Sequence, residues 1–270
     1  MQIRDEAEVE RLMPDFFYRQ SPDAAWSHYM SAVACLGGVK TFWSMGPYYG
    51  TDSYCAIRDA LGSSVDFNLV AQGALPLLGH DRLMSWVRCI DGGYLAATSA
   101  YLAIKGTESY VSADCRGLAM AGWVSFVASG TQHIMGRWNS SESKVAYRLY
   151  RNAAGQVLAG LSESGTAQTH QVASAAVVSL NAWHFVAMTV KPETSLSIMV
   201  DGVWVDTTDA PDSIAAATGT YFTVSAEQGG SAPGGFYASG MFVCGQYIEK
   251  EVLTALFALS APAYGQSPRL

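Results

Sequence analysis

The feature that most constrains this 270-residue chain is a series of short β-rich runs that alternate with turn residues. Ten strands are predicted in the series, with no helical pattern between them. They are Leu83–Val87, Leu118–Val127, Ala146–Arg151, Val157–Leu161, Val177–Val178, His184–Val190, Leu196–Val200, Val203–Val205, Thr220–Val224 and Phe236–Val243. Short strands in this number, without intervening helices, predict an all-β fold of two stacked antiparallel sheets.

Two turns between these runs are chemically specific. Asn152-Ala153-Ala154-Gly155 separates two β-rich runs and contains residues that tolerate positive φ angles. Asp201-Gly202 lies between SLSIMV and VWVD, and an Asp-Gly pair is favoured in type I′ hairpin turns. Both turns predict that the strands on either side pair antiparallel with each other.

The N-terminal region has helical rather than β character. A polar helix is predicted over Asp5–Met13, and a second helix begins after the N-cap residue Ser21, with Pro22 at its first position. Its apolar stripe consists of Trp26, Tyr29, Met30, Val33 and Leu36. Two interpretations stay open. The helix packs on the sandwich of its own chain, or it forms, with Trp43, an assembly arm that docks on another subunit.

The regions on either side of the β series complete the domain plan. Residues 41–52 (TFWSMGPYYGTD) are rich in aromatic residues, Gly and Pro, which predicts an extended connector rather than regular structure. Glu249–Leu259 has helical spacing and predicts a short C-terminal helix against the sandwich. We therefore expect a helical and extended arm over residues 1–56, a sandwich over residues 57–262 and a tail over residues 263–270.

Within the β region, several motifs follow one another in order. They are Asp59–Gly62 (DALG), Gly93–Leu95 (GYL), Gly117-Leu118, Ala121–Val124 (AGWV), Gly136–Trp138 (GRW), Tyr147–Asn152 (YRLYRN), Leu180–Ala187 (LNAWHFVA), Leu196–Val203 (LSIMVDGV) and Ile248–Phe257. In this order they resemble the laminin-G-like, concanavalin A-like jelly rolls of lectins, adhesins and phage structural proteins. The resemblance implies a jelly-roll sandwich up to Pro262 and leaves out the N-terminal arm. Residues 222–248 depart from the family pattern because they lack its customary Asp.

The resemblance also suggests where a ligand would bind. Sugar-binding members of the family often use calcium, which takes about six to eight oxygen ligands. Asp206, Asp209 and Asp212 in the run DTTDAPD are candidates for some of them, although a solvated loop explains the run equally well. Exposed aromatic residues such as Trp138 are candidates for stacking on a sugar ring, with core or interface packing as the alternative.

The sequence gives no sign of catalysis or of a metal centre. It lacks the paired-carboxylate run of glycoside hydrolases and contains no G-x-S-x-G, H-E-x-x-H or phosphate-loop motif. None of the five histidines, His184 in the best-matching strand included, has a Cys or an acidic residue at ligand spacing. The five cysteines form no C-x-x-C pair and are expected to be buried free thiols. We therefore expect a non-enzymatic protein without a cofactor.

Composition and charge restrict the partners. The net charge is -7 and no run of Lys or Arg could line a phosphate backbone, so we do not expect nucleic acid as a partner. No apolar run approaches the roughly 20 residues that span a bilayer, and the charged first residues are not typical of a secretory signal. Hydrophobic residues make up 50% of the chain and charged residues only 14%, which suits burial of surface against protein partners.

Three functional hypotheses follow. The first is a structural protein of a bacteriophage virion, made in the host cytoplasm, which serves as a capsid decoration or tail/fibre-associated subunit and contacts other virion proteins or copies of itself. The alternative is a lectin module that recognises a cell-surface glycan. A third, weaker hypothesis is a divergent glycosidase. The first reconciles a recognition fold with a start that does not resemble an export signal.

Overall fold

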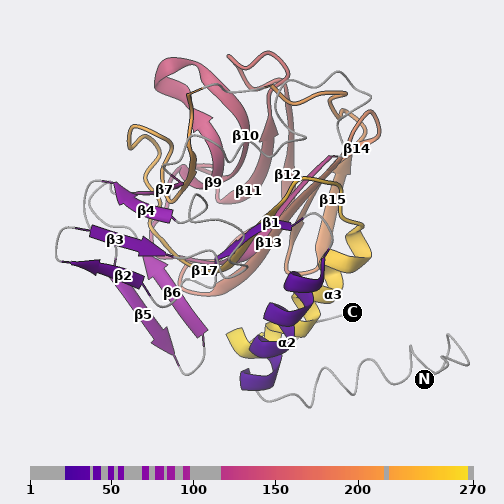
Figure 1. Cartoon of the computed structure of the whole chain (residues 1–270). Coiled ribbons are helices and arrows are strands. Elements are labelled where there is room, and N and C mark those ends of the chain that lie inside the picture. Colours follow the sequence, from indigo (N-terminus) through magenta and orange to yellow (C-terminus); the bar gives the residue numbers. More distant parts are fainter. Residues whose placement is uncertain are drawn as a thin grey trace, which may run out of the picture.

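The computed structural model describes residues 22–36, 39–43, 48–51, 54–57, 69–72, 77–81, 84–88, 94–97, 117–215 and 219–266. These residues form two antiparallel sheets that stack as a sandwich, with two helices packed outside it (Figure 1). The predicted two-sheet all-β fold is therefore confirmed. None of the helices in the described ranges has the length and apolar character that crossing a membrane requires.

The first sheet has eight strands in the order β15-β14-β13-β8-β17-β6-β5, and β1 also pairs with β17. Their bounds are β1 Val39–Trp43, β5 Leu77–Asp81, β6 Met84–Arg88, β8 Leu118–Phe126, β13 Trp183–Lys191, β14 Ser195–Val200, β15 Val203–Thr207 and β17 Phe236–Cys244. Strand β8 lies between β13 and β17 and is buried along its whole length.

The second sheet has nine strands in the order β12-β11-β10-β9-β16-β7-β4-β3-β2. Their bounds are β2 Tyr48–Thr51, β3 Tyr54–Ile57, β4 Leu69–Gln72, β7 Tyr94–Ala97, β9 Gln132–Asn139, β10 Lys144–Arg151, β11 Gln156–Leu161, β12 His170–Val177 and β16 Phe222–Val224. A single 3-10 turn, η3 (Ser140–Glu142), joins β9 to β10.

The main core lies between the two sheets. Because successive side chains of a strand point to opposite faces, alternate residues of each strand supply this core. Met120 and Met188 enter it from the first sheet, and Leu149, Leu161 and Phe222 enter it from the second. Fully burying one such side chain stabilises the fold by about 1.5–3 kcal/mol.

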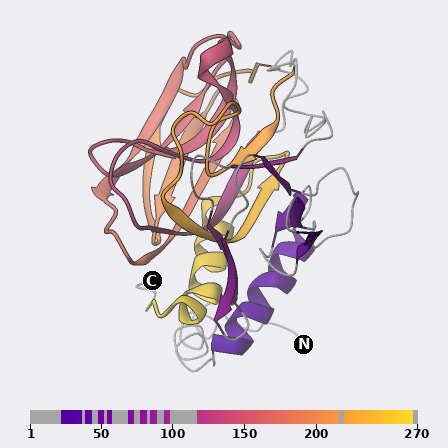
Figure 2. The same ribbon diagram turned by 90° about the vertical axis from the view of Figure 1, so that its left-hand side faces the viewer.

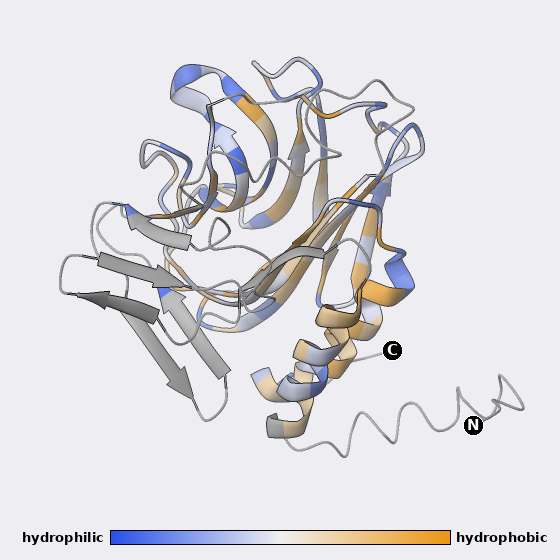
Figure 3. Ribbon diagram, in the orientation of Figure 1, coloured by the Kyte–Doolittle hydropathy of each residue, from blue (hydrophilic) through white to orange (hydrophobic). Residues whose placement is uncertain are grey.

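A second core lies on the outer face of the first sheet, beneath the helices. Helix α2 (Pro22–Cys35) and helix α3 (Lys250–Ser260), which continues into η4 (Ala261–Tyr264), lie side by side there (Figure 2). Much of helix α3 and of the strands behind it is apolar, as the orange segments in Figure 3 show. We call this aromatic-rich layer the helix-side core, and it includes Trp26, Tyr29, Trp123, Phe185, Phe257 and Tyr264.

Helix α2 belongs to the sandwich of its own chain. The predicted helix is confirmed, and Trp26 and Tyr29 are buried in the helix-side core with Met30 packed against it. The Tyr29 hydroxyl donates to the carbonyl oxygen of Gly240 at 2.6 Å, and burial raises the pKa of this hydroxyl well above its ordinary value. These side chains are therefore not exposed for docking on another subunit. Trp43 lies in β1 opposite Met241, but its side chain is outside the described residues, as is the helix predicted over residues 5–13.

The prediction of an extended connector over residues 41–52 is wrong, because this region contains strands. Strand β1 pairs with β17 in the first sheet, and β2 pairs with β3 in the second. The aromatic residues that suggested an irregular segment are also good strand formers, and pairing with existing strands decides the outcome. Parts of residues 1–56, the predicted arm, are thus built into both sheets.

The predicted turns and the C-terminal helix are confirmed. Asp201 and Gly202 have φ angles of 50° and 84°, as a type I′ turn requires, and they join the antiparallel pair β14 and β15. Residues 152–155 join the antiparallel pair β10 and β11. Of the cysteines in the described ranges, Cys244 is buried as expected, whereas Cys35 is exposed, contrary to the expectation of a buried thiol.

Candidate functional site

The register of the second sheet places polar side chains around one central arginine, Arg148 of β10. Arg148 lies opposite Gly136 of β9 and Gly160 of β11, so both neighbouring strands lack a side chain beside it. Farther out, Gly160 lies opposite Gln171 of β12. Residues opposite one another in a ladder share a face, and the flanking residue Leu149 belongs to the main core. Arg148 and Gln171 therefore lie on the outer face of the second sheet.

The Arg148 guanidinium is held between two aromatic rings. Its central carbon lies 4.1 Å from the ring centre of Trp138 and 4.0 Å from that of Tyr150. These distances are within the range of cation–π attraction, which is worth about 0.5–2 kcal/mol according to solvation. The two rings fix the plane of the guanidinium and leave its terminal nitrogens at the edge of the stack.

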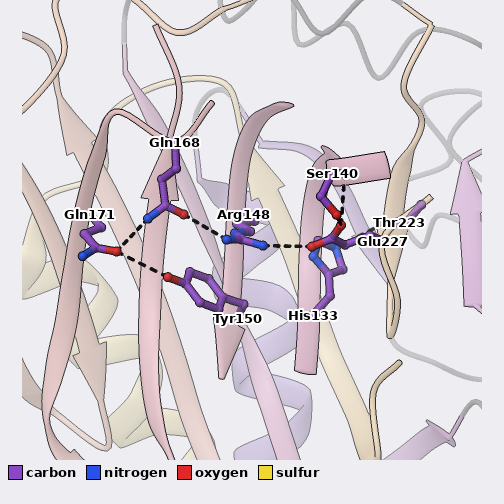
Figure 4. Close-up of polar contacts among 8 residues, drawn as sticks. All are labelled: His133, Ser140, Arg148, Tyr150, Gln168, Gln171, Thr223 and Glu227. Carbon is purple, nitrogen blue, oxygen red and sulfur yellow. Dashed lines mark hydrogen bonds and ion pairs between the residues drawn. The ribbon is translucent and has the colours of Figure 1, made fainter. Parts of the chain in front are cut away.

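Each terminal nitrogen of Arg148 has a partner. Nη1 donates to Glu227 Oε1 at 2.9 Å, and Nη2 donates to Gln168 Oε1 at 3.0 Å (Figure 4). The second carboxylate oxygen of Glu227 accepts hydrogen bonds from the Ser140 backbone N–H, at 3.1 Å, and from the Ser140 hydroxyl. The Glu227 side chain is only 3% exposed. A carboxylate this buried needs a compensating charge, and Arg148 supplies it.

Two glutamines extend the network towards the edge strand β12. The Gln168 amide nitrogen donates to Gln171 Oε1 at 2.7 Å, and the Tyr150 hydroxyl donates to the same oxygen at 3.4 Å (Figure 4). Gln171 is exposed, Gln168 is half-buried and the Arg148 side chain is 16% exposed. We call the seven residues Trp138, Ser140, Arg148, Tyr150, Gln168, Gln171 and Glu227 the Arg148 cluster.

Gly160 provides the space in which Gln168 lies. A Cβ atom at this position would lie 2.5 Å from Gln168 Oε1 and 3.0 Å from Gln168 Cδ, inside van der Waals contact. Gly160 therefore lets the Gln168 amide lie close to the sheet while it accepts from Arg148.

His133 and Thr223 form the buried end of this face. His133 Nε2 lies 3.2 Å from the Thr223 hydroxyl oxygen (Figure 4). Burial, together with the nearby charge of Arg148, lowers the pKa of His133 to about 3. The ring is therefore neutral near pH 7 and adds no charge beside the Arg148–Glu227 pair.

The structure separates the carboxylates predicted as calcium ligands. Asp206 pairs with Lys250 at 2.7 Å, and Asp209 accepts from His170 Nδ1 at 2.9 Å, while Asp212 is exposed. Burial opposes charging of His170, but the neighbouring carboxylates of Glu163 and Asp209 outweigh this effect and raise the pKa of His170. Within the described ranges, no three His, Cys, Asp or Glu side chains come together as a metal site.

Trp138 has a different role from the sugar-stacking one considered from the sequence. Only 3% of this residue is exposed, and the Arg148 guanidinium covers its ring. Trp138 therefore positions Arg148.

Glu227, which sequence reasoning did not single out, belongs to the run 222–248 that lacks the family's customary Asp. Only the folded sheet brings it to Arg148, 79 residues away.

His184 also has partners that sequence spacing did not reveal. Its Nδ1 lies 2.6 Å from Asp201 Oδ2, and its Nε2 lies 2.9 Å from the Ser179 hydroxyl oxygen. Asp201 Oδ1 accepts the backbone N–H of Phe185 at 2.8 Å. The three side chains are connected in the order of a Ser-His-Asp relay. In this fold the relay ties the loop before β13 to the hairpin turn after β14.

The sequence matches one family model. Residues 97–239 match the model of the concanavalin A-like lectin/glucanases superfamily. No curated protein sequence matches the chain.

Solved structures share the fold at low sequence identity. The binding domain of botulinum neurotoxin DC in complex with SialylT has a TM-score of 0.54 and 10% identity, over 83% of this chain and 52% of that one. The same binding domain in complex with rat synaptotagmin II has a TM-score of 0.56 and 9% identity, over 82% and 51%. Trypanosoma rangeli sialidase in complex with sialic acid has a TM-score of 0.52 and 12% identity, over 88% and 38%. The chain thus spans about half or less of these relatives.

Proposed function

Because the chain belongs to the concanavalin A-like lectin/glucanases superfamily, we propose that it is a non-enzymatic carbohydrate-binding module. The saccharide lies on the outer face of the second sheet, at the Arg148 cluster. The observation that carries this proposal is the network of Arg148, Tyr150, Gln168 and Gln171, which reaches the surface at Gln171. Structures that share the fold, as described above, are complexes with SialylT and with sialic acid.

The chemistry of the cluster suits recognition of hydroxyl groups. Sugar hydroxyls both donate and accept hydrogen bonds, and a glutamine side chain offers an amide donor and a carbonyl acceptor. The rings on either side of Arg148 hold the network in place before a ligand arrives, which reduces the ordering cost of binding. The Arg148 cluster is therefore a preorganised polar surface rather than a set of mobile side chains.

The composition of the same cluster favours binding of a glycan over its hydrolysis. Glycosidases of the common types place two carboxylates on either side of the scissile bond. The Arg148 cluster contains a single carboxylate, Glu227, and both of its oxygens already accept hydrogen bonds. A glycan bound here meets no pair of acid and base within the cluster.

A role in a bacteriophage virion stays a prediction, and so does a homo-oligomer. The N-terminal helix supports these two roles less than expected, because Trp26 and Tyr29 are buried in their own chain. Composition still favours a protein partner, and a neurotoxin binding domain that contains this fold forms a complex with rat synaptotagmin II. Particle association, or a stable oligomer measured by light scattering, would support this role.

A glycan array followed by calorimetric titration tests the proposed function. We expect the wild-type chain to bind at least one glycan and Gln171→Ala to weaken that binding about 3- to 10-fold, since one hydrogen bond is worth about 0.5–1.5 kcal/mol. The matched control is Thr208→Ala, an exposed residue after β15 on the other sheet. Absence of binding to every glycan, or equal losses in both variants, would contradict the proposal.

A further inference from the structure

The Arg148 cluster differs from an anion-binding site in its internal charge balance. An arginine that recognises a carboxylate presents two parallel N–H donors to it. Here Nη1 is directed to Glu227 and Nη2 to Gln168, at 2.9 and 3.0 Å. The remaining nitrogen, Nε, is shielded from solvent and has no hydrogen-bond partner in the described ranges. Each terminal nitrogen of Arg148 therefore already uses one of its two N–H groups within the cluster, and the charge of Arg148 is balanced by Glu227.

We infer that the Arg148 cluster selects an uncharged saccharide over one that carries a carboxylate, such as a sialylated or uronic-acid glycan. This inference rests on the proposed function and names its ligand class. The charge of Arg148 is already compensated by Glu227, so a second carboxylate beside the pair would be repelled by Glu227 without gaining a cation. The net charge of -7 on the whole chain acts in the same direction.

The groups at the surface of the cluster are neutral. Gln171 Oε1 accepts from both Gln168 and Tyr150, while its amide nitrogen has no partner in the described part of the chain. That nitrogen is the donor we expect to meet a sugar hydroxyl. Gln171 and Arg148 stand on strands separated by one strand, which corresponds to about 10 Å across the sheet. A ligand that reaches from one to the other meets amide and hydroxyl groups along this path.

The selectivity depends on one carboxylate, which gives a direct test. In Glu227→Gln, Arg148 loses its compensating charge but keeps a hydrogen-bond acceptor of the same size. We expect this variant to gain affinity for acidic glycans relative to neutral ones. The matched control is Glu163→Gln, which removes an exposed carboxylate that contacts His170 rather than Arg148.

The experiment compares a neutral oligosaccharide with its sialylated form on the wild-type chain and on both variants. We expect the wild type to bind the neutral form at least about 10-fold more tightly, Glu227→Gln to reduce that ratio at least about 10-fold, and Glu163→Gln to leave it unchanged within about 2-fold. Equal or tighter binding of the sialylated form by the wild type would overturn the inference while the proposed function stands. Binding of neither form, together with absence of binding to every glycan of the array, would contradict the proposed function itself.

A second measurement keeps the inference testable if Glu227→Gln does not fold. Attraction between a charged ligand and the protein is screened by salt, whereas hydrogen bonding to a neutral sugar is not. We expect the Kd of the wild type for its best glycan to change less than about 2-fold between about 50 and about 500 mM salt. A steady weakening of binding with salt would show that an anion is being recognised and would overturn the inference.

Discussion

The two outer faces of the sandwich have opposite chemistry. The outer face of the first sheet is covered by helices α2 and α3 and is filled with aromatic rings, for example Trp123 stacked on Tyr264 with centroids 4.0 Å apart. The outer face of the second sheet bears the Arg148 cluster, in which aromatic rings hold a charge rather than one another. The same two-layer fold thus uses one face for stability, and we propose that the other face serves recognition.

The largest expected effect is a loss of unfolding free energy when an aromatic side chain is removed from the helix-covered face. Trp123 is fully buried, and its indole N–H donates to the Ser260 hydroxyl at 3.0 Å. We expect Trp123→Ala to lower the free energy of unfolding by about 3–5 kcal/mol, as large-to-small changes in a core do. Denaturant unfolding measures this loss. Val252→Ala on the exposed side of α3 is the control, and a Trp123 loss as small as that of the control would break the comparison.

The next effect concerns the buried end of the polar face. The pKa of His133 is about 3 in the folded chain and near 6.5 when unfolded, so the unfolded chain binds the extra proton below pH 6.5. Stability due to the neutral ring is complete above pH 6.5 and is lost as the pH falls towards 3. From about pH 7 to about pH 4 the loss amounts to about 3 kcal/mol.

His133→Gln isolates that contribution, because glutamine does not titrate. We expect the variant to lose less stability than the wild type over the same pH range, as measured by denaturant unfolding at each pH. Carboxylates titrate in both proteins and cancel in the comparison. If the two proteins lost stability in parallel, the His133 ring would not be held neutral by the polar face.

A smaller effect is expected where the loop before β13 meets the hairpin turn after β14. Asp201→Asn keeps a turn-forming residue but removes the carboxylate that orients His184, so we expect a loss of about 1–2 kcal/mol in unfolding free energy. Ser179→Ala, at the exposed end of the relay, should cost less. If a fluorophosphonate labelled Ser179, the relay would be an active nucleophile and the assignment of a purely structural tie would be wrong.

Local sequence patterns predicted those parts of the fold that depend on neighbouring residues. The Asp201-Gly202 turn and helix α2 follow from positive-φ tolerance and from capping. Strand β9 was not among the predicted strands, because QHIMGRWN is polar with a glycine inside and does not alternate clearly. Strand β12 was nearly missed as well, since HQVASAAV is rich in alanine, a poor strand former.

The candidate site was harder to predict than the fold. Trp138 was singled out from the sequence, but with a different role, and Glu227 was not singled out at all. Trp138 and Arg148 lie in β9 and β10, Gln168 lies in the loop between β11 and β12, and Glu227 follows β16, so only the folded sheet brings these four segments together. No spacing rule within one segment reveals an ion pair between residues 79 positions apart. The acidic run at residues 206–212 was predicted to supply calcium ligands because its carboxylates are close in sequence. In the folded chain, Asp206 and Asp209 contact different partners.

Nuclear magnetic resonance titration with a neutral oligosaccharide tests the central claim most directly. The claim is that the outer face of the second sheet binds the saccharide. We predict that the largest amide shifts cluster at Arg148, Gln168 and Gln171, with small shifts in helices α2 and α3. Shifts centred on Asp206–Asp212, or on the helix-covered face, would contradict it.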